Sequence, residues 1–198
     1  MMKNNYPKLY FIYSYVYSST LADLTGKKYN GKEQKEAAKY IKNIDEEFSK
    51  NSDAVIKGIS NVSGLDWQKP LIDVYVSKYP PYSFSVPLTI KIYKNKKFGV
   101  AILVHELVHN ILFQNQKLVN YKKLFKDFEN ENLSTKYHII EGAILYKLNE
   151  KIFSDGFGGF FKYDDWRSKK ASKEYRRAIE IVIEKGPDNI IKRYIIKK

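Results

Sequence analysis

The apolar run at residues 98–113, FGVAILVHELVHNILF, constrains the fold more than any other segment of the chain. Apolar side chains occupy nearly every position, so a helix formed by this run is apolar on almost all sides. Such a helix is stable in a globular protein only when other elements cover it. We therefore predict a buried central helix, in a chain whose 198 residues and 43% hydrophobic content suffice for one domain with a sizeable core.

Hydrophobic periodicity predicts the elements around this helix. Apolar residues at three- and four-residue spacing indicate amphipathic helices, and alternating or β-branched runs indicate strands. No internal repeat or linker interrupts them, so we predict a single domain, residues 1–198, of the α+β class. Its small, mostly antiparallel sheet packs on the central helix, and a helical C-terminal part follows. The predicted strands are residues 9–18, 71–76 and 86–93, and the predicted helices are residues 32–49, a short helix before Gly64, 118–128, 135–153, 172–185 and a tail after 188.

Two histidines and a glutamate stand inside the predicted central helix in the pattern H-E-x-x-H. His105 and His109 are four residues apart, so their imidazoles lie on one face of a helix, one turn apart, and can bind one metal ion. Glu106 projects beside them, where it can act as the general base that takes a proton from water. We interpret these residues as part of a catalytic metal site.

The competing interpretation is that two core histidines and a buried glutamate share a helix by chance. A buried carboxylate without a partner costs several kcal/mol, and residues 98–116 contain no lysine or arginine that could pair with it. The chain has three histidines in all, and two of them have this spacing. Because the chain has no cysteine, a metal must be held by His, Asp or Glu, and we predict Zn²⁺.

A zinc site of this kind needs a third protein ligand. The metzincin pattern is excluded, because Leu112 and Asn115 occupy the positions of its glycine and third histidine. The predicted helix at 135–153 offers His138 and Glu141, three residues apart. Its apolar face is broad, so periodicity does not decide which of the two faces the metal.

The segments HELVH (105–109) and EGAILY (141–146) resemble the gluzincins, the zinc peptidases related to thermolysin, and in particular their peptidase-MA-like group. The resemblance covers about residues 84–153. It implies hydrolysis of peptide bonds in a peptide or protein substrate, with His105, His109 and Glu141 as zinc ligands and Glu106 as base. It also implies that the strand at 86–93 borders the cleft and pairs with extended substrate.

The sequence departs from this pattern at Leu145, where thermolysin-like enzymes have an aspartate that orients a zinc-bound histidine. Asp155, Asp164 or a backbone carbonyl could replace that acceptor. For the donor that stabilises the oxyanion we choose Tyr146, with His138 and Tyr163 as alternatives. The glycine-rich loop at 156–159 is interpreted as a plain turn or a mobile lid.

The formal charge of +13 raises nucleic acid as a partner. Only four of the 35 basic residues are arginines and the lysines are scattered, so we expect a solvated lysine surface and no specific nucleic-acid binding. No stretch approaches the roughly 20 apolar residues of a membrane span, and the tyrosine-rich N-terminal segment is a poor signal peptide, so we expect a cytoplasmic protein. A catalytically inactive zincin-like domain that binds peptides or has a regulatory role is the alternative function, and the intact Glu106 argues against it.

Overall fold

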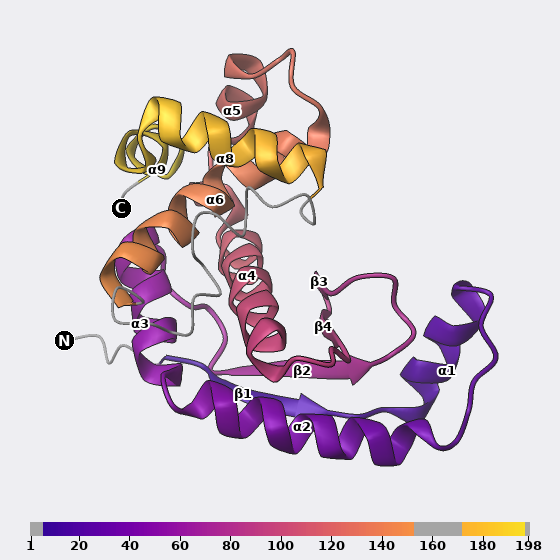
Figure 1. Ribbon diagram of the computed structural model, residues 1–198. Coiled ribbons are helices and arrows are strands. Elements are labelled where there is room, and N and C mark those ends of the chain that lie inside the picture. Colours follow the sequence, from indigo (N-terminus) through magenta and orange to yellow (C-terminus); the bar gives the residue numbers. More distant parts are fainter. Residues whose placement is uncertain (1–5, 153–171, 197–198) are drawn as a thin grey trace. The chain divides into compact units, whose positions relative to one another are not determined.

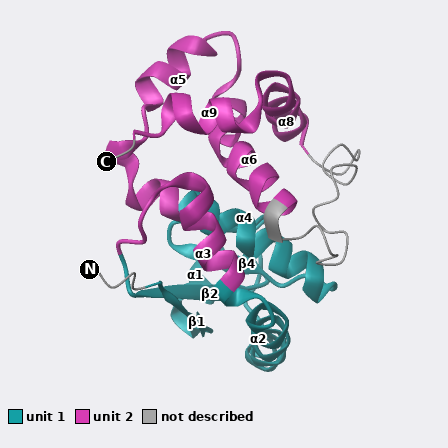
Figure 2. Cartoon of the chain, turned by 90° about the vertical axis from the view of Figure 1, so that its left-hand side faces the viewer, with its two compact units in different colours: residues 1–53, 69–110 teal, residues 54–68, 111–198 magenta. Residues whose placement is uncertain are grey.

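The computed structural model describes residues 6–152 and 172–196, and it confirms the α+β class (Figure 1). The chain forms two compact units, residues 1–53 with 69–110 and residues 54–68 with 111–198 (Figure 2). Each unit is built from two separate stretches of sequence, and two helices, Ser52–Ser63 and Lys96–Gln114, continue from the first unit into the second. The prediction of a single domain is not tested by this division and stays a prediction.

The first unit contains a four-stranded sheet in the order β1-β2-β4-β3. Strand β1 pairs with β2, and β2 with β4, in parallel, and only β3 pairs antiparallel with β4. The sheet is therefore mixed, and the prediction of a mostly antiparallel sheet was wrong. A long helical connection between β1 and β2 lets the second strand run in the same direction as the first. The strand bounds are β1 Lys8–Ile12, β2 Leu71–Ser77, β3 Phe84–Ser85 and β4 Leu88–Lys91.

The predicted strand at 9–18 is correct only in its first part, because helix α1 (Tyr15–Leu24) follows β1. The side chain of Ser14 accepts a hydrogen bond from the backbone N–H of Tyr17 and caps this helix. The two buried residues of α1, Ser18 and Ala22, are four apart, which is the spacing of a helix face. Tyrosines at two-residue spacing, Tyr13, Tyr15 and Tyr17, gave the false strand period, although Tyr15 is exposed and Tyr17 is half-buried.

Strand β4 has a neighbour on both sides, so it is not the sheet edge expected for the strand at 86–93. On its outer side Leu88 and Thr89 pair with Ser85 and Phe84, and the backbone N–H of Lys91 donates to a serine hydroxyl at 3.0 Å. The sheet edge on this side is the short strand β3. An extended peptide that joins the sheet here must pair with β3.

Helix α2 (Glu33–Ser49) confirms the predicted amphipathic helix, with Ala37, Tyr40, Ile44 and Phe48 on its buried face. Its face meets the start of helix α4 (Lys96–Gln114) at Gly99. A side chain on Gly99 would collide with the hydroxyl of Tyr40, so the glycine permits the close approach of the two helices.

Helix α4 is buried along most of its length, as its sequence predicts. Phe98 and Phe113 near its ends are its exposed large apolar residues. No helix in the described ranges is both long and apolar enough to cross a membrane. The buried apolar residues of α4 are Val100, Ala101, Leu103, Val104, Leu107, Val108, Ile111 and Leu112.

The second unit is helical, which confirms the predicted C-terminal helices. Its longest helix, α6 (Leu133–Ile152), packs against α8 (Lys173–Lys185) and α9 (Pro187–Tyr194). It also contains α3 (Ser52–Ser63, from residue 54 on), the 3₁₀ helix η1 (Gln116–Leu118) and α5 (Tyr121–Asp127). Residues 153–171 lie outside the described residues, and with them Asp155, Tyr163, Asp164 and the glycine-rich loop.

Glu47 connects α2 to the start of α4 through a charge pair. Its carboxylate accepts hydrogen bonds from Lys50 at 2.8 Å and Lys96 at 3.0 Å. These bonds lower the pKa of Glu47 below its ordinary 4.5, against the opposing effect of burial. A carboxyl with a lowered pKa in the folded state stabilises the fold above its ordinary pKa, and that stability is lost as the pH falls through the lowered value.

We therefore expect Glu47→Gln to reduce the free energy of unfolding by about 1.5–3 kcal/mol at pH 7, the size of a charge-assisted hydrogen bond. The difference from the wild type should shrink as the pH falls below 4.5. Urea unfolding at both pH values measures it. Glu46→Gln is the matched control, because Glu46 pairs with Lys42 at 4.0 Å in an exposed position, where ion pairs contribute little. Equal effects of the two substitutions at pH 7 would contradict this role of Glu47.

Candidate metal centre

His105 and His109 lie on one face of α4, as their spacing predicts. Their ring centroids are 4.9 Å apart and the ring planes are inclined at 70°. Both side chains are half-buried, in contrast to the fully buried leucines and valines on the other faces of the same turns. Helix α4 therefore presents both imidazoles on one partly exposed face, and its other faces at these turns are apolar and buried.

Glu106 is only 6% exposed, and the phenol of Tyr93 lies close enough to sense its charge. Burial is the main cause that raises the pKa of Tyr93; the hydrogen bond with Ser83, at 3.1 Å, opposes it, and the negative charge of Glu106 adds to it. Tyr93 follows β4 and stacks edge-on against Phe98 at the start of α4, with centroids 5.0 Å apart. Nothing in the sequence distinguishes Tyr93 among the 17 tyrosines of the chain.

Helix α6 carries the two alternatives for the third ligand. Glu141 is fully buried, and His138 is half-buried one turn before it. The Nδ1 atom of His138 lies 2.7 Å from the carbonyl oxygen of Ser134. Because a carbonyl only accepts, the ring proton belongs on Nδ1, and the Nε2 lone pair is the one that can bind a metal or a proton. This carbonyl orients His138, whereas the acceptor expected for the zinc-binding His105 or His109 stays a prediction.

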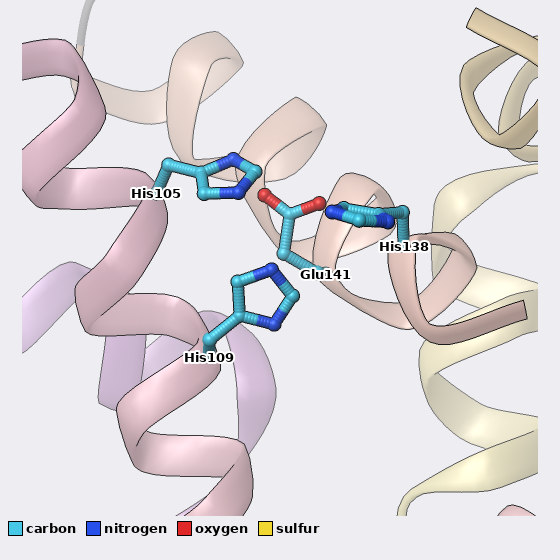
Figure 3. A group of neighbouring side chains, drawn as sticks. All are labelled: His105, His109, His138 and Glu141. Atoms are coloured by element: carbon cyan, nitrogen blue, oxygen red, sulfur yellow. The ribbon is translucent and has the colours of Figure 1, made fainter. Parts of the chain in front are cut away.

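Figure 3 shows the side chains of His105, His109, His138 and Glu141 pointing toward one another. Each offers one possible ligand atom, and these atoms all lie within 4.8 Å of one another. Imidazole nitrogen and carboxylate oxygen are the donors that catalytic zinc sites use, so this donor set fits zinc. The structure brings both alternatives for the third ligand into the group and leaves the choice between Glu141 and His138 open.

Tyr146, the predicted oxyanion donor, is half-buried on α6. It follows Glu141 by five residues, which is about 140° around a helix with 3.6 residues per turn. Tyr146 and Glu141 therefore project from different sides of α6. The role of Tyr146 stays a prediction.

Tyr175 on α8 is a site residue that the sequence did not reveal. It is 6% exposed, and its ring lies edge-on against the ring of His138 with centroids 5.1 Å apart. Burial is the main cause that raises the pKa of Tyr175 well above its ordinary value, and the charge of Glu141 adds to the shift. The hydroxyl therefore keeps its proton. Only the packing of α8 on α6 brings these residues together, more than 30 positions apart in sequence.

Comparisons of the chain with protein-family models, with curated proteins and with solved structures found no match. The resemblance to gluzincins therefore depends on the two short segments quoted above, and the chemistry of this group of side chains must be argued from the residues themselves.

We expect the purified protein to hold about one zinc ion per chain and Glu141→Ala to remove it, because a site with two protein ligands binds zinc much more weakly than a site with three. His138→Ala is the matched variant on the same helix and should keep the metal. Metal analysis of the two variants, purified without a chelator, compares them directly. Loss of zinc in His138→Ala with zinc retained in Glu141→Ala would indicate a three-histidine site instead.

Proposed function

We propose that the chain is a zinc-dependent peptidase in which His105, His109 and Glu141 hold the metal and Glu106 is the general base. The observation that carries this proposal is the group of imidazole and carboxylate side chains around the H-E-x-x-H turn of a buried helix. Two histidines at this spacing, a carboxylate on a second helix and a glutamate directly after the first histidine form the residue set of metal-assisted hydrolysis.

A zinc ion held by these residues would supply Lewis acidity, which polarises a peptide carbonyl and lowers the pKa of water. Glu106 is adjacent to the ligands but is not among them, so its carboxylate is available to take a proton from the attacking water and to pass it to the leaving amine. Its low exposure keeps this proton transfer away from bulk solvent. Tyr146 is our choice for the donor to the developing oxyanion, and Tyr93, which lies near Glu106, is a second phenol for this role.

The substrate class we propose is a peptide or protein in extended conformation. The edge strand β3 is connected to α4, because the side-chain amide of Asn110, next to His109, donates to the backbone carbonyl of Ser85 at 3.0 Å. A peptide that adds to β3 would thus be aligned relative to the helix that carries the base. This replaces the expectation that substrate pairs with the strand at 86–93.

The alternative function is a noncatalytic domain that binds peptides at the same residues. It predicts that the wild-type protein binds zinc and does not hydrolyse peptides. An activity assay of the zinc-loaded wild type therefore distinguishes the two functions. The carboxylate of Glu106 favours the peptidase, because a binding module has no need of a buried base next to its ligands, and burying one is costly.

Replacement of Glu106 by glutamine tests the mechanism. We expect Glu106→Gln to reduce kcat for hydrolysis of casein or a quenched fluorescent peptide by about 10²–10⁴-fold, the usual contribution of a general base, while zinc content stays unchanged. Glu46→Gln, on the exposed face of α2, controls for the chemical change. Activity of Glu106→Gln within about twofold of the wild type would refute Glu106 as the base. Absence of hydrolysis by the zinc-loaded wild type across several substrates would favour the noncatalytic alternative.

A further inference from the structure

The sheet edge at β3 is uncharged and carries exposed apolar side chains. Edge strands that must stay unpaired usually carry charged residues, lysine above all. None of the residues from 79 to 90 is charged, in a chain of which 29% is charged. Tyr82 is 69% exposed and Val86 is 50% exposed, and the half-buried Phe84 lies between them. This edge therefore lacks the charges by which a sheet usually avoids pairing with another chain.

Prolines limit the length of this edge. Two prolines precede Tyr82, and Pro87 follows Val86. Proline has no N–H group, so it cannot donate a hydrogen bond to an added strand. Regular pairing with another strand is therefore confined to residues 82–86. An edge of this length suits a short extended segment better than a long interface between two sheets.

The pairing of β3 with β4 places Phe84 and Ser85 on opposite faces of the sheet. Residues directly opposite each other on two antiparallel strands lie on the same face. Phe84 pairs with Thr89, and Ser85 pairs with Leu88 of the apolar core. Thr89 lies on the face that α1 covers, because its hydroxyl is hydrogen-bonded to the hydroxyl of Tyr17 at 2.8 Å. Phe84 is thus on the α1 face of the sheet, and Ser85 is on the core face.

A peptide added to β3 would direct its side chains alternately to these two faces. Those on the α1 face come against Phe84, and also against Tyr82 and Val86, since residues two apart in a strand share a face. Those on the core face lie beside Ser85, whose carbonyl accepts the hydrogen bond from Asn110 of α4 at 3.0 Å. Every second residue of the peptide would therefore meet an apolar side chain of the edge.

We infer that Tyr82, Phe84 and Val86 set the substrate preference: the site takes extended segments with apolar residues at alternate positions. This inference rests on the proposed function, in which the edge holds the substrate. Cross-strand pairs of aromatic and aliphatic side chains stabilise strand pairing. A charged residue in the same place would lose water against the apolar side chains without gaining a partner.

Two labelled hexapeptides test this preference, one of alternating leucine and serine and one of serine alone. The protein is the zinc-loaded Glu106→Gln variant, which on the proposed mechanism binds a peptide without cutting it. An alternating peptide can place its leucines on the α1 face by its choice of register. We expect fluorescence polarisation to give a dissociation constant about tenfold lower for the leucine peptide, because several cross-strand pairs each contribute a small factor.

Substitutions at the edge should remove the preference. Phe84→Ser, in the same background, should reduce it to about threefold or less and leave the affinity for the serine peptide nearly unchanged. The matched control is Tyr10→Ser, because Tyr10 is an aromatic residue, 60% exposed, on β1 at the opposite edge of the sheet. It should keep the full preference. Tyr82→Ser, which removes an exposed ring, should also lower the preference and tests the same edge if Phe84→Ser does not fold.

The outcomes for the two proposals differ. A preference that depends on Phe84, together with no hydrolysis by the zinc-loaded wild type, would refute the peptidase and support the edge as a surface for the same peptides. Hydrolysis without any preference for the leucine peptide, or a preference that survives both Phe84→Ser and Tyr82→Ser, would overturn the inference and leave the peptidase standing. A wild-type dimer in sedimentation that Phe84→Ser dissociates would mean that the edge binds a second copy of this chain, which also overturns the inference.

Discussion

The burial of two carboxylates on largely apolar helices is the constraint on which the rest of the site depends. Glu106 on α4 is 6% exposed and Glu141 on α6 is fully buried. Removing an ionised carboxylate from water costs several kcal/mol unless polar partners compensate. The same low dielectric strengthens the interactions that remain, so the proposed zinc ion would act more strongly on these carboxylates than an ion bound at the surface. A chain that needed only stability would place leucine or alanine at both positions.

A glycine in each of the two helices that carry the site, α4 and α6, allows a neighbouring helix to pack closely against it. Gly99 lets Tyr40 of α2 approach the start of α4, and Gly142 lets Ile179 of α8 approach α6 directly after Glu141. In each case the cost of glycine in a helix, about 1 kcal/mol, is offset by packing that fixes a helix carrying site residues. Positions of this kind are needed because a metal site tolerates displacements of only about half an ångström in its ligands.

The sequence predicted what depends on local pattern. Helix α2 and the buried helix α4 follow from apolar spacing, and His105, Glu106 and His109 from a spacing that has a direct geometric meaning. The parts that failed depend on contacts distant in sequence. The direction of β2 is set by a connection of almost 60 residues, and the ring contact of Tyr175 with His138 by the packing of α8 on α6. The predicted strand at 9–18 is wrong for a local reason. It runs through Ser14, which caps a helix.

The central claim is a zinc ion bound by two imidazoles and one carboxylate, and X-ray absorption at the zinc K-edge of the purified protein tests it most directly. The account predicts nitrogen and oxygen neighbours at about 2.0–2.1 Å with the outer-shell scattering of two imidazole rings. Scattering from three imidazoles would replace Glu141 with His138 as the third ligand. A spectrum without imidazole scattering, or a protein that holds no zinc, would contradict the account.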